Sequence, residues 1–200
     1  MGKVTGGVSR EFAQRRRRQA QVRPSEQRLR LGALWLPTNP VNEFTSFAAA
    51  VEERGFDELW LAEDCFEQGA FSAAAVALAA TSRVVVGIGL LPVGLRNAAI
   101  TAMEIATLAN LFPGRLKVAF GHGVESWMRQ VGARPDQRVA YLREVAGAVR
   151  RLVGGERVSS TGWVVLDDVA LAQAPESAPE FMVGSTGTSY RHSTALLVMS

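Results

Sequence analysis

Two adjacent carboxylates, Glu63 and Asp64, directly follow the apolar stretch 57–62 (DELWLA). Carboxylates at the end of a buried strand can hydrogen-bond a polar ligand or hold a proton for general acid catalysis. They can also cap the helix that follows, because the first N–H groups of a helix lack backbone partners. We favour the ligand role, since parallel α/β folds bind their ligands at the carboxyl ends of the strands.

His122 is a second catalytic candidate, and it lies between Gly121 and Gly123 after the apolar run 116–120. Glycines at a strand end allow a ligand to approach the backbone closely. The alternative is a histidine that hydrogen-bonds a neighbouring loop. A metal site is not predicted, because the only other histidine, His192, lies near the C-terminus.

A third candidate is the segment Gly184-Ser185-Thr186-Gly187, which follows the short apolar run 181–183. Successive backbone N–H groups and two hydroxyls suit the binding of a phosphate. The segment lacks the lysine of a P-loop, and a plain turn explains it equally well.

These candidates lie at strand ends in an alternating pattern of strands and helices. Apolar β-branched runs predict strands, and apolar residues at helical spacing predict helices. The predicted strands are 29–36, 57–62, 84–91, 116–120 and 181–183, and the predicted helices are 43–54, 70–81, 98–111 and 136–152. Residues 158–168 predict a hairpin outside the main sheet, and 188–200 give one short apolar turn. In the helix 98–111, the spacing places Ile100, Met103, Ala106 and either Leu108 or Leu111 on the inward face.

Consecutive strand–helix units predict a parallel sheet covered by helices, which is an α/β fold. The choice lies between an open doubly wound sheet and a (β/α)8 barrel. A nucleotide-binding doubly wound sheet needs G-x-G-x-x-G after its first strand, whereas residues 37–42 read PTNPVN. The sequence therefore favours the barrel. At the opposite end of a strand, Arg115 is predicted to bind backbone or carboxylate groups, which is a structural role.

The composition is that of an ordinary globular protein, with 48% hydrophobic and 20% charged residues in 200. The single cysteine, Cys65, excludes an internal disulfide framework and fits a reducing, cytoplasmic setting. No apolar run approaches the ~20 residues of a membrane-spanning helix. The N-terminus also lacks the apolar core of a secretory signal.

The net charge of +3 is unevenly distributed. Residues 1–30 hold nine basic and two acidic residues, so they carry +7 and leave −4 for the remainder. We therefore infer no nucleic-acid partner from the basic pI. Residues 1–28 contain too few large apolar residues to offset the cost of ordering them, and they predict a disordered basic extension.

The stretch 84–132 resembles the luciferase-like monooxygenase superfamily of flavin- and deazaflavin-dependent oxidoreductases. Several motifs carry the resemblance in register. WLAED (60–64) is similar to the family's second-strand signature, and VGIGLLPVGLRNAA (86–99) to its third strand and loop. MEIATLANLFPGRLKVAFGHG (103–123) matches the family's ATL–GR–G.G run, and ESWMRQVGA (125–133) resembles the helix that follows. The resemblance covers about 29–187.

The resemblance implies a TIM-type barrel that binds coenzyme F420 or FMN at the strand carboxyl ends. Members act on paired donors with oxygen or transfer a hydride to a small organic substrate. The run GHGVESWMRQVGAR favours F420, with FMN as the alternative.

The resemblance also implies roles for individual residues. Catalytic roles would fall to Glu63, Asp64 and His122, with Glu63 also facing the cofactor. Gly89, Leu90 and Leu91 would form a bulge behind the cofactor ring, where the family often has a non-prolyl cis peptide. Other cofactor contacts would come from Gly121, Gly123, Gly184, Ser185, Thr186 and Gly187. The substrate pocket would include Trp35, Asp64, Asn97 and Trp127.

The number of strand units predicts an incomplete barrel. A full barrel takes about 250 residues, whereas about five βα units can be counted here. We expect a C-terminally truncated barrel domain at 29–200, with a small-molecule substrate, no nucleic-acid or membrane partner, and compatibility with a homo-oligomer. The alternative is an inactive half-barrel without catalysis. A third hypothesis, an α/β binding module with a nucleic-acid arm, depends only on residues 10–18.

Overall fold

The computed structural model describes residues 29–185 and 195–198, and its chain divides into two units, 1–30 and 31–200. The description below concerns the second unit. The predicted basic extension at 1–28 lies outside the described residues, as do Thr186 and Gly187.

A six-stranded sheet forms the centre of this unit, in the order β1-β2-β3-β4-β7-β8. The strands are β1 (Gly32–Trp35), β2 (Glu58–Leu61), β3 (Val85–Pro92), β4 (Leu116–Gly121), β7 (Glu180–Ser185) and β8 (Ala195–Val198). The first five are parallel neighbours in chain order, and β8 pairs antiparallel with β7. The five predicted strands are thus confirmed. The prediction of only a short apolar turn near the C-terminus was wrong, because β8 is a strand.

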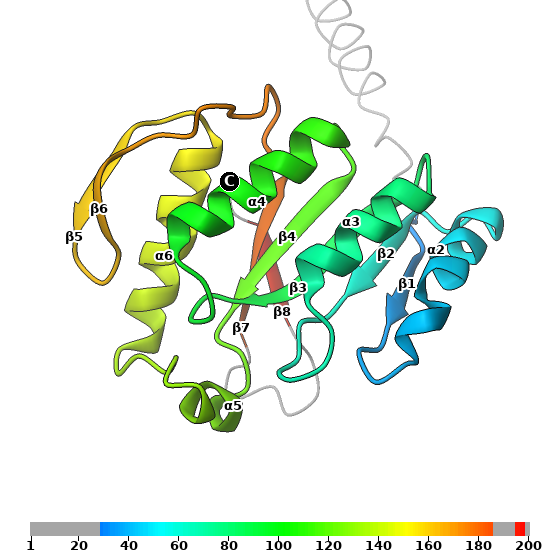
Figure 1. The fold of residues 1–200 in the computed structure, drawn as a ribbon, viewed down its shortest axis with the longest axis horizontal. Helices are drawn as coiled ribbons and strands as arrows, with labels where there is room; N and C mark the ends of the chain where they lie inside the picture. Colours follow the sequence, from blue (N-terminus) through cyan, green and yellow to red (C-terminus); the bar gives the residue numbers. More distant parts are fainter. Residues whose placement is uncertain (1–28, 186–194, 199–200) are drawn as a thin grey trace, which may run out of the picture. The chain divides into compact units, whose positions relative to one another are not determined.

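Helices follow the strands along the chain and gather on one face of the sheet (Figure 1). They are η1 (Val41–Glu43), α2 (Phe44–Glu53), α3 (Ala70–Ala80), α4 (Ala98–Leu111), α5 (Glu125–Gln130) and α6 (Arg138–Val153). A doubly wound sheet would reverse its strand order and carry helices on both faces. The sequential order and the one-sided helices therefore confirm the barrel type. Within the described residues the sheet remains open.

The predicted hairpin is also present, as the separate sheet β5 (Val158–Thr161) and β6 (Val165–Val169). Glu144 of α6 fixes it, because its carboxylate accepts hydrogen bonds from the backbone N–H groups of Trp163 and Val164, both at 3.0 Å. The hairpin therefore packs outside the main sheet.

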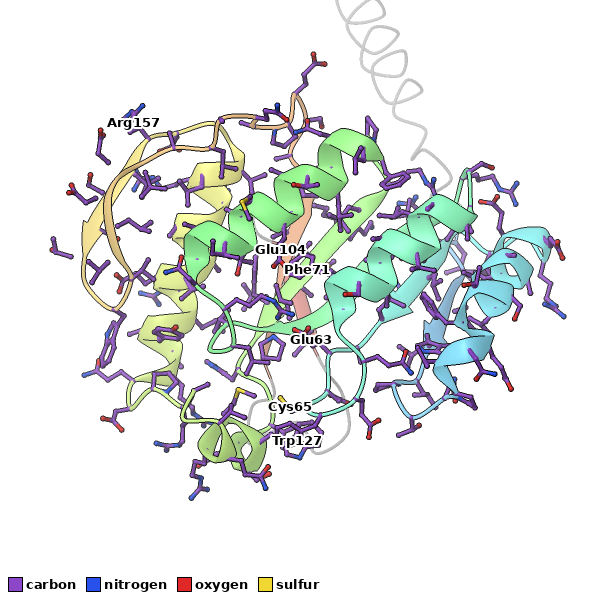
Figure 2. All side chains as sticks on the ribbon, in the orientation of Figure 1. Glu63, Cys65, Phe71, Glu104, Trp127 and Arg157 are labelled. Carbon is purple, nitrogen blue, oxygen red and sulfur yellow. The ribbon has the colours of Figure 1, made fainter. Side chains whose placement is uncertain are left out.

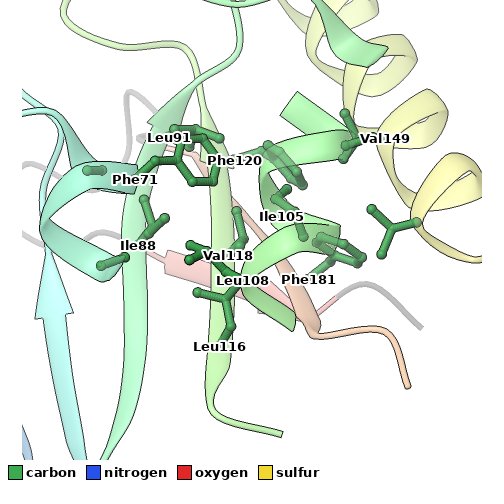
Figure 3. Packing of buried hydrophobic residues seen from close by; sticks show 14 of the residues in the cluster. Phe71, Ile88, Leu91, Ile105, Leu108, Leu116, Val118, Phe120, Val149 and Phe181 are labelled. Atoms are coloured by element: carbon green, nitrogen blue, oxygen red, sulfur yellow. The ribbon is translucent and has the colours of Figure 1, made fainter. Parts of the chain in front are cut away.

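The core lies between the sheet and the helices (Figure 3). Ile88 of β3 and Phe120 of β4 are fully buried, and the Phe120 ring stacks on Phe181 with 5.7 Å between centroids. Ile105 of α4 and Val149 of α6 close this core from the helix side. Large apolar residues at alternate strand positions thus fill the layer under the helices.

The predicted inward face of α4 was partly wrong. Ala106 and Leu108 are buried as predicted, whereas Ile100 and Met103 are about half exposed. The fully buried Ile105 was not predicted to face inward. Apolar residues occur on every side of this helix, so their spacing alone could not identify the buried face.

Arg115 has the structural role predicted for it. Its guanidinium donates hydrogen bonds to the carbonyl oxygens of Leu78, Thr81 and Val84 at 2.8–3.2 Å, and to the Thr81 hydroxyl at 2.6 Å. These carbonyls end α3 and begin β3, where the backbone lacks partners of its own. One side chain therefore joins the amino ends of β3 and β4 to the end of α3.

We expect Arg115→Met to lower the free energy of unfolding by about 3 kcal/mol, because it leaves several backbone carbonyls without donors. Urea denaturation measures the change. The control is Arg143→Met on α6, an exposed position for which we expect almost no effect. Equal stability of the two variants would contradict this account of Arg115.

Candidate active site

A cavity of about 510 Å³ lies at the carboxyl ends of the parallel strands. Its volume is in the usual range for small-molecule sites. The loops after β2 and β4, the end of β3, and single residues of α5, α6 and β7 contribute to it. The lining residues are Ala62, Glu63, Asp64, Gly89, Leu90, Pro92, His122, Gly123, Val124, Glu125, Arg138 and Gly184. Seven predicted site residues are thus brought together: Glu63, Asp64, Gly89, Leu90, His122, Gly123 and Gly184.

The other predicted site residues do not line this cavity. Trp35 is only 4% exposed; its indole N–H donates to the Gln68 side chain at 2.9 Å, and its ring packs on Phe44 and Phe47. Asn97 caps α4 by accepting a hydrogen bond from the Ala99 N–H at 2.8 Å.

Leu91 and Gly121 are buried, and Trp127 lies on α5. Ser185 is the last residue of β7, and nothing further is described of its side chain.

Glu63 is held by an ion pair that the sequence analysis did not predict. Both its oxygens accept hydrogen bonds from Arg96, at 2.6 Å each, and Oε1 also accepts one from the Ala70 N–H at 3.1 Å. Arg96 lies over the Phe71 ring, 5.2 Å from its centroid. This ion pair raises the pKa of Arg96 above its usual range. We call the contacts of Glu63 with Arg96 and Ala70 the Glu63 clamp.

The clamp gives the two adjacent carboxylates different environments. Glu63 is buried, and both of its oxygens accept hydrogen bonds from protein groups, which matches the helix-capping alternative raised by the sequence. Asp64 lines the same cavity and is partly exposed. It is thus the carboxylate that can accept or donate a hydrogen bond toward a ligand. Both acids, after burial itself, raise the pKa of the neighbouring Cys65 thiol.

The predicted bulge in β3 is present. Gly89 pairs with Ala119 and Leu91 pairs with Phe120, so Leu90 is an extra residue in the strand. The peptide bond between Gly89 and Leu90 is cis, as the family resemblance implied. A second non-prolyl cis bond joins Cys65 to Phe66.

Leu90 explains two of the glycines predicted as cofactor contacts. A Cβ atom on Gly121 would lie 2.5 Å from a methyl group of Leu90, and a Cβ on Gly184 would overlap the other methyl group. The Leu90 side chain therefore lies across β4 and β7, where only glycine leaves room for it.

Trp60 is a feature of the inner sheet face that sequence reasoning missed. Its ring lies over Gly87 and Gly89 of the next strand, and a Cβ on Gly87 would enter the ring. Its indole N–H donates to the Glu58 carboxylate at 2.8 Å. The signal was available, because alternation places Trp60 opposite the core residues Leu59 and Leu61.

Arginines gather around Glu125 and Arg138, which line the cavity across from the carboxylates Glu63 and Asp64. Arg129, Arg134 and Arg138, which we call the arginine cluster, all contact the single carboxylate of Glu125 at 3.0–3.4 Å. Burial and then the charge of Arg138 lower the pKa of His122 below its usual value, so this imidazole is neutral at pH 7. Arg134 also lies 3.8 Å from Asp136, so three guanidinium groups face two carboxylates and leave a net charge of +1, which favours an anionic group here.

A second cavity, of about 520 Å³, lies between α4 and residues 169–173. Its lining holds no charged side chain, and it is remote from the strand carboxyl ends. Across the described residues no group of three His, Cys, Asp or Glu side chains could hold a metal ion, and no helix there could span a membrane.

Comparison with known proteins gives a consistent assignment. A family model described as luciferase-like monooxygenase matches residues 12–196. The F420-dependent glucose-6-phosphate dehydrogenase of Kineococcus radiotolerans is 33% identical over 159 residues, which are 72% of this chain and 47% of the relative. The chain spans about half the length of the curated relatives it matches.

Solved structures show the same fold. The F420-dependent tetrahydromethanopterin reductase from Methanopyrus kandleri aligns with a TM-score of 0.71 and 20% identity, over 80% of this chain and 51% of that one. The oxygenating constituent of 3,6-diketocamphane monooxygenase from Pseudomonas putida, solved with FMN, aligns with a TM-score of 0.67 and 17% identity. That alignment covers 78% of this chain and 50% of the other.

We expect Gly121→Ala to lower the free energy of unfolding by about 1–3 kcal/mol, because the new methyl group overlaps Leu90. Urea denaturation measures the change. The matched control is Gly147→Ala on α6, where a Cβ meets nothing within 4 Å. That change should stabilise the helix by up to about 1 kcal/mol. The same effect in both variants would contradict the proposed Leu90 packing.

Proposed function

The chain belongs to the luciferase-like monooxygenase family, and we propose that it is an oxidoreductase that binds coenzyme F420, with FMN as the alternative cofactor. One observation carries the proposal. The cavity combines the Gly89–Leu90 bulge and the Asp64 carboxylate with Arg138, which belongs to the arginine cluster beside the cavity. The relatives named as F420-dependent support the first cofactor, and the FMN complex of a structural neighbour supports the second.

The residues present fit such a cofactor. Its ring system is flat and largely apolar, and the bulge offers backbone and the Leu90 side chain as one wall of the cavity. Its phosphate-bearing chain is anionic, which matches Arg138 and the uncharged, hydrogen-bonding His122. We propose that Leu90 and Gly89 support the ring, while Arg138 and the backbone at Gly184 hold the anionic chain.

The proposed chemistry divides between cofactor and protein. The bound cofactor supplies hydride transfer, or oxygen activation in the case of FMN. Asp64 hydrogen-bonds the substrate and holds or accepts its proton, because its side chain faces the cavity while that of Glu63 is held by the clamp. Glu63 acts by orienting this strand end. His122 donates or accepts a hydrogen bond beside the anionic group.

The substrate class we propose is a small organic molecule, in a reducing, cytoplasmic setting consistent with the single cysteine. The alternative function is an incomplete barrel without catalysis. The two differ in one observable property, which is cofactor binding by the purified 200-residue chain.

We expect the purified chain to shift the visible absorption of F420, FMN or both, and to quench the fluorescence of the bound ligand. Arg138→Gln should weaken binding about tenfold, because it removes a charge-assisted contact to the anionic chain. The matched control is Arg143→Gln on the same helix, which is exposed and outside the cavity lining, and its affinity should equal that of the wild type.

Binding should also weaken as salt is raised from 50 to 500 mM, and this dependence should be smaller in Arg138→Gln. A chain that is folded by circular dichroism but binds neither cofactor would refute the proposal and support the non-catalytic alternative. Equal loss in both arginine variants would refute the role of Arg138.

A further inference from the structure

Glu104 lies in the middle of α4, outside the lining of the active-site cavity. Its carboxylate nevertheless reaches the Glu63 clamp, because Oε2 is 3.5 Å from Nε of Arg96. Figure 2 shows Glu104 and Phe71 between α4 and α3, and Glu63 below them, near the loop that leads into α3. Arg96 connects these three residues, because its guanidinium pairs with both glutamates and lies over the Phe71 ring.

Arg96 meets the two glutamates with different nitrogen atoms. Nη1 and Nη2 donate to Glu63, whereas Nε faces Glu104. A guanidinium is a rigid planar fork, so fixing Nε also fixes the direction in which the two Nη groups point. Glu104 and Glu63 therefore act on one orientation of Arg96 without competing for the same donor.

Glu104 is an unusual residue to place here. Its side chain is 35% exposed, but Oε2 is buried and has no hydrogen-bond partner among the described residues, so the 3.5 Å ion pair is what compensates this oxygen for its loss of solvent. A carboxylate with a buried oxygen is costly to ionise unless a nearby positive charge compensates it. The surrounding charges that act on it are Arg96 from the β3–α4 loop and Glu63 from the β2–α3 loop.

We propose that Glu104 is a positioning residue whose negative charge orients Arg96 and thereby tightens the Glu63 clamp, so that protonation of Glu104 loosens the β2–α3 loop beside the cavity. The clamp itself is argued from the distances between Arg96, Glu63 and Ala70 alone. Its consequence for ligand binding rests on the proposed function.

The direction of the pH effect follows from burial. Desolvation raises the pKa of Glu104, and the charge of Glu63 raises it further, while Arg96 opposes both. Glu104 therefore gains its proton at a higher pH than an exposed glutamate does. The clamp is tight at neutral and alkaline pH, where Glu104 is ionised, and loosens as the solution is acidified.

Cys65 provides a reporter that needs no ligand. It is the only cysteine in the chain, it is partly buried, and it lies two residues after Glu63. A looser loop exposes the thiol more often, so its reaction with 4,4′-dithiodipyridine becomes faster. The fraction of Cys65 present as thiolate also changes with pH. Comparing the reaction rates of two variants at the same pH largely removes this effect.

The experiment compares wild type with Glu104→Gln between pH 4.5 and 8. We expect Cys65 in Glu104→Gln to react about two- to fivefold faster at pH 8, the size of effect typical of a partly exposed ion pair. The two rates should converge as wild-type Glu104 is protonated. Glu104→Asp, which keeps the charge on a shorter side chain, should retain a weaker pH dependence and serves if Glu104→Gln does not fold.

The matched control is Glu53→Gln, an exposed glutamate on α2, whose rate should follow the wild type at every pH. The decisive quantity is the Cys65 reaction rate of Glu104→Gln divided by that of the wild type. A ratio that stays at one, falls below one or is independent of pH would overturn the proposal. Loss of folding alone would raise the rate at all pH values, so it would be recognised by the missing convergence.

Cofactor affinity provides the second readout. If FMN or F420 binds, its dissociation constant should rise on acidification more in wild type than in Glu104→Gln, since the ligand's own titration is common to both. A chain that binds neither cofactor yet shows the Cys65 profile would refute the proposed function and leave the clamp intact. Binding with identical pH profiles in the two variants would overturn the role of Glu104.

Discussion

The bidentate ion pair between Arg96 and Glu63 is the interaction on which the geometry of this site depends. It joins the loop after β2 to the loop after β3, and Glu63 also accepts the first free N–H group of α3. Breaking one partner of a buried pair leaves an uncompensated charge, so both loops are constrained together. The pair also decides which acid is free, because it leaves Asp64 as the carboxylate facing the cavity.

A steric constraint acts on the inner face of the sheet, which is the face not covered by the helices. Trp60 covers two glycines of β3, and Leu90 covers one glycine each in β4 and β7. Parallel strands lie about 4.8 Å apart, so a large side chain on one strand can lie flat only where its neighbours have no Cβ. The bulge at Leu90 redirects that side chain toward the cavity. Glycines that look like ligand contacts in the sequence are therefore also required by packing.

The sequence predicted the fold well because its strands and helices are separated by clear Pro and Gly signals, and its first strand lacks a nucleotide-binding glycine motif. It partly misplaced the buried face of α4, where apolar residues on every side remove the periodic signal. Glu63 and Asp64 were found because polar groups after strands are visible in one dimension. Arg96 was not given its role, because its partners are 33 residues away at Glu63 and eight residues away at Glu104. Trp35 and Asn97 were assigned to the pocket by sequence position, while hydrogen bonds to Gln68 and Ala99 direct them elsewhere.

The same topology explains why most of the site comes from a short part of the chain. In a sheet whose parallel strands follow chain order, the loops after β2, β3 and β4 must lie side by side at one edge. The clamp, the bulge and the arginine cluster therefore converge although each is encoded separately, between residues 63 and 138. Charge then distinguishes the two sides of the cavity, with an available carboxylate at Asp64 on one side and Arg138, with the rest of the arginine cluster behind it, on the other. An elongated ligand with an anionic end has one orientation in such a field, because reversing it would place its negative charge beside Asp64.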